Sequence, residues 1–342
     1  MNILDCYKPE LETALLATGI KKFRAAQIYQ YLFNRNIFDI AQMTQLSNQD
    51  VVALEKNDIT VGMPSIVSEQ NSADGATKKI LLELSDGNTV ESVWMQHNYG
   101  NSVCISTQVG CAMDCQFCAS AKNGLVRNLT AGEMVGQLLA FKQTGMEKLH
   151  SIVIMGSGEP LNNYDEVVKF MRLIHEAYTF NLGYRNMTLS TSGIVPNMYK
   201  LADEGIPVTL AVSLHAPNDT LRSELMPINR KYGIRDIIKA ADHYFDSNGR
   251  QVTYEYVLIK DKNSSLKDAE ELADLLRGRV CHINLIPLND NYKMGLRRPI
   301  GKDIQAFADY LENRGLSVTV RREMGSGIQA ACGQLQAKQG EE

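Results

Sequence analysis

The fold class is indicated first by the stretch Ser151-Ile152-Val153-Ile154-Met155-Gly156-Ser157-Gly158-Glu159-Pro160. Its apolar first half is typical of a short buried strand, and the glycines and proline of its second half are typical of a loop. The following segment, Glu166–Glu176, has apolar residues at helical spacing. A buried strand, a polar loop and an amphipathic helix in this order predict one βαβ unit of a parallel sheet.

The same alternation continues along most of the chain. Strands are expected at Val103–Ser106, Ser151–Met155, Met187–Ser190, Val208–Ser213, Val252–Leu258, His282–Pro287 and Ser317–Val320. Helices are expected at Glu133–Lys142, Glu166–Glu176, Asp236–Phe245, Asp268–Arg277 and Asp303–Asn313. About six βαβ units are too few to close an eight-fold barrel, so we expect an α/β fold with an open, partial barrel.

A different pattern precedes the barrel. Residues 1–57 are predicted to be largely helical, and Lys79–Leu84 and Thr89–Trp94, joined through Asp86-Gly87, predict a β-hairpin. We therefore expect a helical accessory domain over residues 1–57, a β-hairpin extension over 58–97, the barrel over 98–322 and a C-terminal loop over 323–342.

The composition is that of an ordinary globular protein. With 342 residues, 44% hydrophobic and 22% charged, the chain is neither largely disordered, collagen-like nor a small disulfide scaffold. No apolar run approaches the roughly 18 residues of a membrane span, and the first residues do not resemble a secretory signal, so we expect a cytoplasmic protein. The net charge of −4 gives no overall electrostatic attraction to nucleic acid, although it leaves room for a local basic patch.

The seven cysteines are unevenly placed, and four of them fall between residues 104 and 118. Cys111, Cys115 and Cys118 have the spacing C-x3-C-x2-C, which can hold three irons of a [4Fe–4S] cluster and leave the fourth iron open. The alternatives are a zinc site completed by Cys104 or a histidine, or three unrelated buried thiols. The sequence has no second C-x2-C pair of the kind usual in zinc sites, and this favours the cluster.

Polar or small residues follow several of the expected strands directly. These loops are Gly156–Pro160, Ser190–Gly193, Ser213–His215 and Pro287–Asn289. Any one of them is most simply a turn, but the carboxyl ends of parallel barrel strands meet at one rim. The four loops together therefore predict a single polar pocket at that rim.

The cysteine spacing, with Phe117 before the last cysteine, resembles the radical S-adenosylmethionine (SAM) superfamily. More narrowly, several motifs resemble the RlmN/Cfr family of RNA methyltransferases. These motifs are Cys104–Cys111, Arg127–Thr130, Ser213–Asn218, Met226–Asn229 and Ala330–Leu335. The resemblance extends over residues 21–336 and is closer to the RlmN branch than to the Cfr branch.

This resemblance implies a partial (β/α)6 TIM-like barrel of the radical SAM type, with an N-terminal domain that helps to hold RNA. It implies a [4Fe–4S] cluster on the three cysteines, and it implies methylation of C2 of an adenosine in the peptidyl transferase centre of 23S rRNA and of an adenosine next to the anticodon in tRNA. It also implies an electron donor such as flavodoxin, and we expect a monomer. The positions that match the family's SAM-binding residues are Gly158, Glu159, Ser190, Ser213, Leu214, His215 and Asn289.

The resemblance further implies a two-thiol mechanism. Cys332 would carry the methyl group as S-methylcysteine, Cys104 would resolve the protein–RNA adduct through a transient disulfide with Cys332, and Glu91 would accept the C2 proton. Either cysteine could instead be a packed thiol. Glu91 shares a strand face with Val93 and Met95, where an acid is unexpected, and such carboxylates can serve as bases. Cys6 and Cys281 match no functional position and are interpreted as packing residues.

Three other functions remain open from the sequence. They are a Cfr-like C8 methyltransferase, a radical SAM enzyme for a small molecule, and a non-catalytic, zinc-stabilised RNA-binding protein. The basic residues Lys21, Lys22, Arg24 and Arg35 and the aromatic residues Phe23, Tyr29, Tyr31 and Phe33 could contact RNA or belong to an amphipathic helix with a buried face. Two places depart from the family pattern: Ser157, where a larger apolar residue is usual, and 325–329, which lacks the usual acidic residues.

Overall fold

The computed structural model describes residues 1–122, 124–146, 148–289, 295–321, 325–330 and 333–335. Its centre is one ten-stranded sheet in the order β1-β2-β3-β4-β7-β8-β9-β10-β11-β12. The strands are β1 (Ser65–Asn71), β2 (Thr77–Glu83), β3 (Thr89–His97), β4 (Gly100–Ile105), β7 (Ser151–Ile154), β8 (Met187–Thr191), β9 (Thr209–Ser213), β10 (Val252–Leu258), β11 (Cys281–Pro287) and β12 (Ser317–Val320). Strands β1 to β4 pair antiparallel, and β4 and β7 to β12 pair parallel.

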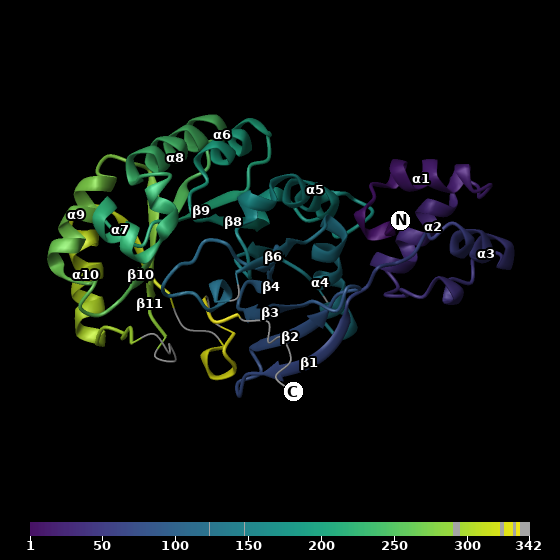
Figure 1. Ribbon diagram of the computed structural model, residues 1–342, viewed down its shortest axis with the longest axis horizontal. Coiled ribbons are helices and arrows are strands. Elements are labelled where there is room, and N and C mark those ends of the chain that lie inside the picture. The colour runs from purple at the N-terminus through teal and green to yellow at the C-terminus, as the bar shows by residue number, and fades with distance from the viewer. Residues whose placement is uncertain (123, 147, 290–294, 322–324, 331–332, 336–342) are drawn as a thin grey trace.

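Helices connect the consecutive parallel strands and lie along the outside of an open arc (Figure 1). They are α4 (Ala131–Gln143), α5 (Tyr164–His175), α6 (Val195–Asp203), α8 (Ile234–Asn248), α9 (Leu266–Leu276) and α10 (Gly301–Asn313), with the short α7 (Asp219–Leu225) before α8. Within the described residues, β12 pairs with β11 alone and β4 pairs with β3 and β7, so the barrel does not close. The α/β fold with a partial barrel is therefore confirmed.

Local sequence signals explain where these helices begin and which face they bury. Thr130 Oγ1 accepts a hydrogen bond from the backbone N–H of Glu133, and the Glu133 carboxylate accepts one from the N–H of Thr130, which is the capping box that the sequence predicts for α4. On α5, Val167, Phe170 and Ile174 recur at helical spacing and are buried against the sheet side of the core.

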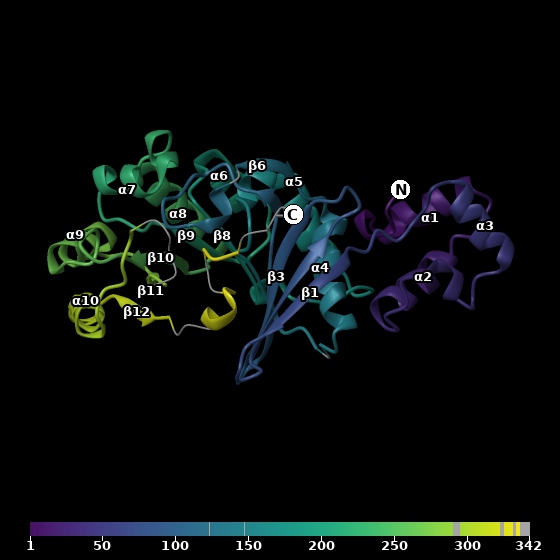
Figure 2. The ribbon, with the colours of Figure 1, turned by 60° about the horizontal axis from the view of Figure 1, so that its bottom comes forward.

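The predicted hairpin is formed by β2 and β3, with Lys79 opposite Val93 and Leu81 opposite Glu91. Strand β3 then pairs with β4, so that Val93 lies opposite Cys104. The antiparallel strands thus continue directly into the parallel barrel and carry Glu91 to its wall. Figure 2 shows β1 and β3 as a long slab beside the barrel and α4.

The N-terminal helices α1 (Lys8–Ala17), α2 (Arg24–Phe33) and α3 (Asn48–Lys56) form a separate group at one end of the molecule (Figures 1 and 2). The rings of Tyr29 and Tyr178 meet edge to face with centroids 4.9 Å apart, and those of Phe33 and Phe180 with centroids 5.5 Å apart. Of the aromatic residues considered for RNA contact, Tyr29, Tyr31 and Phe33 are buried, as an amphipathic helix requires, whereas Phe23 is 50% exposed.

Cys6 and Cys281 are buried, as the packing interpretation predicts. None of the helices in the described part of the chain is long and apolar enough to cross a membrane.

Candidate active site

The loop after β7 lies against Thr107 and Gln108, which follow β4, and Gly158 makes this approach possible. A Cβ atom at Gly158 would lie 2.6 Å from Cβ of Gln108 and 2.8 Å from Oγ1 of Thr107, and the φ angle of Gly158 is +108°. Only glycine tolerates both conditions. The next residue, Glu159, donates its backbone N–H to Oε1 of Gln108 over 2.8 Å. The glycine therefore fixes the position of the Glu159 carboxylate.

Glu159 is buried, and its hydrogen bonds hold the loop that follows β8 in place. Its carboxylate accepts hydrogen bonds from Oγ1 of Thr191 (2.7 Å), from the backbone N–H of Ser192 (2.7 Å) and from that of Leu161 (3.0 Å). Burial raises the pKa of Glu159, and these hydrogen bonds oppose the rise. The contacts on the described residues give Glu159 a positioning role at the rim of the barrel.

The loop after β9 supports the cysteine loop. His215 adopts φ of +57°, and its Nδ1 accepts a hydrogen bond from the backbone N–H of Val257 over 3.0 Å, which assigns the ring proton to Nε2. Burial, with a smaller effect from the charge of Arg222, lowers the pKa of His215 to about 3. The neutral ring meets that of Phe117 edge to face at 4.7 Å. Leu214 is buried beside His215, and the hydroxyls of Ser190 and Ser213 lie 3.5 Å apart.

The cysteine loop closes on itself and docks on α7. A Cβ atom at Gly110 would lie 1.9 Å from the carbonyl oxygen of Gly124, which accepts the backbone N–H of Cys111 over 3.0 Å. The N–H of Gln116 donates to the carbonyl of Leu225 at the end of α7, also over 3.0 Å. Burial raises the pKa of the Cys111 thiol to about 12, while backbone N–H groups of Met113 and Gly158 oppose the rise. The first cysteine thus lies beside Gly158 at the predicted rim.

The donor set of this loop, three cysteine thiols, fits an iron–sulfur cluster. Among the described residues, no three histidine, cysteine or acidic side chains converge on a single metal ion. In a cluster each thiolate binds a different iron, so the three sulfurs need not converge. Cys104, which could have completed a zinc site, packs instead with Val93, Ala330 and Leu335.

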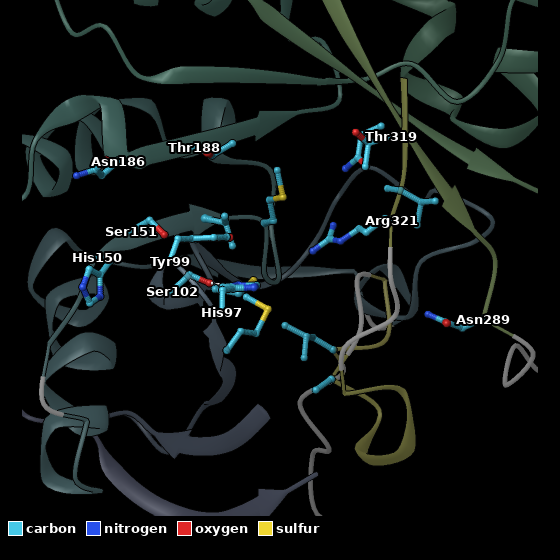
Figure 3. Close-up of a pocket in the computed structure, with 18 of the residues that line it drawn as sticks. His97, Tyr99, Ser102, His150, Ser151, Asn186, Thr188, Asn289, Thr319 and Arg321 are labelled. Carbon is cyan, nitrogen blue, oxygen red and sulfur yellow. Dashed lines mark hydrogen bonds between the residues drawn. The ribbon is translucent and has the colours of Figure 1, made fainter. Parts of the chain in front are cut away.

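A cavity of about 810 Å³ lies inside the barrel (Figure 3). Its lining includes Cys104, Met155, Asn289 and Leu335, together with the stacked rings of His97 and Tyr99, whose centroids lie 4.7 Å apart. Oδ1 of Asn289 is buried, and within the described part of the chain it has no hydrogen-bond partner. Such an acceptor on a cavity wall suits the ammonium or a hydroxyl group of SAM.

The structure separates the predicted SAM-binding residues into two sets. Asn289 lines the cavity, whereas the others do not line it. Hydrogen bonds connect Glu159 with the loop after β8 and Ser190 with Ser213, so these residues hold the ends of neighbouring strands together.

Glu91 forms a buried ion pair that sequence reasoning missed. Nζ of Lys79 lies 2.9 Å from Oε1 of Glu91, and these residues are 8% and 7% exposed. Lys79 also donates to the carbonyl of Gln329 over 3.4 Å, and Oγ of Ser106 donates to the carbonyl of Glu91 over 2.7 Å. The sequence could have indicated this pair only through Lys79, a charged residue at an inward position of the β2–β3 hairpin. The register of the two strands is needed to place Lys79 beside Glu91.

Cys332 lies outside the described residues, but parts of its flanks do not. Ala330 packs against Cys104. The carbonyl of Gly333 accepts the N–H of Ala119 over 2.8 Å, and that of Leu335 accepts Oγ of Ser120 over 2.7 Å. The transient disulfide of Cys104 with Cys332 therefore stays a prediction, and the structure shows no disulfide between two of the described cysteines.

Comparison with known proteins identifies the family. Residues 105–276 match the radical SAM superfamily, and residues 1–55 match the ribosomal RNA large subunit methyltransferase N-terminal domain. The chain is 45% identical over 334 residues to the probable dual-specificity RNA methyltransferase RlmN of Clostridium botulinum, covering 98% of this chain and 97% of that one. The chain belongs to the RlmN family of radical SAM RNA methyltransferases. It is also 47% identical over 339 residues to the corresponding protein of Desulforamulus reducens, covering 99% of this chain and 96% of that one.

A solved structure agrees with this RlmN assignment. The radical SAM methyltransferase from Sphaerobacter thermophilus superposes with a TM-score of 0.95 at 44% identity, covering 99% of this chain and all of that one. The family resemblance and the fold predicted from the sequence are therefore confirmed.

Ser157, which departs from the RlmN family pattern, has a structural role. Its hydroxyl lies 3.2 Å from that of Ser120, and the Ser120 hydroxyl donates a hydrogen bond to the carbonyl of Leu335.

Proposed function

We propose that this member of the RlmN family methylates C2 of one adenosine in the peptidyl transferase centre of 23S rRNA, and of the adenosine next to the anticodon in tRNA. The dual specificity named for its relatives supports both substrates. The observation that carries the proposal is the grouping of Cys104, the Glu91–Lys79 pair and the cysteine loop around the C-terminal segment. RNA as a substrate places this activity in the cytoplasm, and we expect a monomer there.

Cys111, Cys115 and Cys118 would hold the [4Fe–4S] cluster. Asn289 would contact SAM directly, while Gly158, Glu159, Ser190, Ser213, Leu214 and His215 would shape the rim on which SAM lies. When bound, the cluster and SAM supply the electron, the methyl group and the radical that this chemistry needs, with an electron donor such as flavodoxin as the source of electrons. The cavity wall would orient the reacting groups.

The remaining steps belong to side chains of this protein. Cys332 would hold the methyl carbon as S-methylcysteine, so that the carbon can be delivered to an atom that has no lone pair with which to attack a methyl donor. Glu91 would accept the C2 proton when the adduct breaks down, and Lys79 would hold the Glu91 carboxylate in place. Cys104 would then attack the sulfur of Cys332, so that an S–S bond forms and the bond from that sulfur to the methylene carbon breaks. The carbon would keep the electron pair and take up a proton as the methyl group of the released RNA, and the reductant would return the disulfide to two thiols before the next turnover.

The test is product analysis with reconstituted protein. The anaerobically reconstituted enzyme is incubated with SAM, a reductant and either a 23S rRNA fragment or a tRNA, and the RNA is digested to nucleosides for mass spectrometry. We expect 2-methyladenosine from both RNAs. Appearance of 8-methyladenosine instead would show a Cfr-like activity, and SAM cleavage that does not depend on RNA would indicate a small-molecule substrate.

Two variants test the site within the same assay. Cys115→Ala should abolish reductive cleavage of SAM, because one iron loses its thiolate. The matched control is Cys281→Ala. This change removes a buried thiol at the first residue of β11, and the variant should retain SAM cleavage. Asn289→Ala should weaken SAM binding about tenfold, the cost of one hydrogen bond to a charged group. Full cleavage by Cys115→Ala would show that the cluster lies elsewhere.

A further inference from the structure

Arg222 is a fully buried arginine on α7, and its hydrogen bonds within the described part of the chain go to neutral acceptors. Its Nε donates to the carbonyl of Leu214 over 3.0 Å, and its Nη1 donates to Oδ1 of Asn229 over 2.9 Å. Its Nη2 donates to the carbonyls of Ser192 (2.6 Å) and Ser213 (2.8 Å). These bonds hold the ends of β8 and β9 together, but none of them neutralises the guanidinium.

Within the described part of the chain, Arg222 has no carboxylate at ion-pair distance. Asp219 is the nearby acid, and its Oδ1 accepts instead from Nδ2 of Asn229 (3.0 Å) and from the backbone N–H of Ile234 (2.8 Å). Burial lowers the pKa of Arg222 to about 10, so the guanidinium remains charged at neutral pH. A buried cation without an anion is costly. The fold therefore retains a positive charge that a bound anionic group would compensate.

The position of Arg222 indicates which group that is. One turn after Arg222, the carbonyl of Leu225 receives the N–H of Gln116 from the cysteine loop. Cys115 and Phe117 pack against the apolar cluster that contains Leu225 and Met226. The cation thus lies beneath the loop that would carry the cluster.

We propose that Arg222 is the buried counter-charge of the iron–sulfur cluster and raises its reduction potential. This inference rests on the proposed function, since it requires the cluster on Cys111, Cys115 and Cys118. A cluster held by thiolates is anionic, and reduction by one electron adds a further negative charge. A nearby cation in a medium of low dielectric constant stabilises the reduced form more than the oxidised form. Arg222 is a positioning residue in this scheme, because it acts through the cysteine loop and the ends of β8 and β9.

The experiment measures the reduction potential of the cluster and not the rate of RNA methylation. The reconstituted protein, without SAM or RNA, is titrated with a reductant while the reduced cluster is followed by electron paramagnetic resonance. Arg222→Met removes the charge and keeps much of the side-chain volume, and Arg222→Lys keeps the charge. We expect Arg222→Met to reduce the equilibrium constant for reduction at least tenfold, which is 59 mV for one electron. Arg222→Lys should change it much less.

Arg279→Met is the matched control. Arg279 is a partly buried arginine paired with Asp242 next to β11, at the end of the barrel away from the cysteine loop. Its removal should leave the potential unchanged. If Arg222→Met does not fold, the double change Asp219→Asn with Asn229→Asp moves a carboxylate to the position that is 2.9 Å from Nη1 of Arg222, with no change in net charge. This variant should also lower the potential.

The outcomes separate the two proposals. A wild-type protein that takes up no cluster contradicts the proposed function itself. If wild type and variants contain the full complement of iron and have equal potentials, the cluster assignment holds and the role of Arg222 is wrong.

Discussion

Lys79 connects two parts of the candidate site through a single ammonium group. It lies 2.9 Å from the Glu91 carboxylate and 3.4 Å from the carbonyl of Gln329, three residues before Cys332. A carboxylate that must accept a proton from the substrate needs a fixed orientation, and a buried ion pair with a second hydrogen bond provides it. Lys79 therefore contacts both the proposed base, Glu91, and the segment that precedes Cys332, the thiol proposed to carry the methyl group.

Replacing Lys79 should affect stability and RNA release together. Lys79→Met removes the ammonium group that lies 2.9 Å from the buried Glu91 carboxylate, which we expect to cost on the order of 3 kcal/mol in urea unfolding. It should also lengthen the life of the protein–RNA adduct, and Lys79→Arg should restore part of both properties. Lys78→Met is the control, since Lys78 lies on the same strand but pairs with the more exposed Glu69. A Lys79→Met protein with normal adduct lifetime would confine Lys79 to a structural role.

The close approach of Gly158 to Gln108 leads to another prediction at the level of single residues. Gly158→Ala introduces a Cβ atom 2.6 Å from Gln108 at a φ angle of +108°. We expect a loss of about 2–5 kcal/mol, which combines overpacking with backbone strain. SAM binding should weaken as well, because Glu159 follows directly. Gly183→Ala, where a Cβ meets nothing within 4 Å, should be nearly neutral in the same unfolding and binding measurements.

At the level of elements, periodicity predicted the barrel because each βαβ unit carries its own signal. The expected strand His282–Pro287 is β11, which begins one residue earlier, and the expected helix Asp303–Asn313 lies within α10. Strand β1 escaped prediction because its residues are mostly polar and exposed, so no alternation distinguishes them from a loop. Helix α7 is only seven residues long, too short for a helical period to be recognised.

The sequence could predict those parts of the candidate site whose residues lie close together along the chain. The cysteine spacing and the polar strand ends identified the rim, since both are properties of contiguous residues. The Lys79–Glu91 pair depends on the register of β2 and β3, and the contacts of Arg222 depend on three loops meeting. Neither can be derived from one segment alone. The proposed roles of Cys332, Cys104 and Glu91 come from the family resemblance, because no periodicity indicates them.

At the scale of the whole molecule, buried polar groups inside the barrel should influence stability. Glu255 on β10 is buried, and its Oε2 accepts a hydrogen bond from Nδ2 of Asn284 over 2.8 Å. Burial raises its pKa above the usual 4.5, while the charge of Arg321 and the hydrogen bond from Asn284 oppose the rise. The folded protein therefore holds a proton that the unfolded chain releases, so stability falls as the pH rises above 4.5.

Glu255→Gln should remove this dependence. Relative to wild type, we expect the variant to gain stability progressively as the pH rises above 4.5, because its amide never ionises. Urea unfolding at several pH values measures the difference. Glu312→Gln, at an exposed position of α10, controls for the loss of one charge. A constant difference between Glu255→Gln and wild type across this range would show that Glu255 does not titrate with folding.

The central claim is that two thiols, Cys332 and Cys104, act in sequence on RNA, and the most direct measurement is the covalent adduct. Each variant is reconstituted, incubated with SAM, reductant and RNA, and analysed by denaturing electrophoresis and by mass spectrometry of the peptide that contains Cys332. Cys104→Ala should accumulate a protein–RNA crosslink in which one methylene joins Cys332 to the base, and Cys332→Ala should bind RNA without forming a crosslink. Loss of activity in both variants, with a crosslink in neither, would contradict the account.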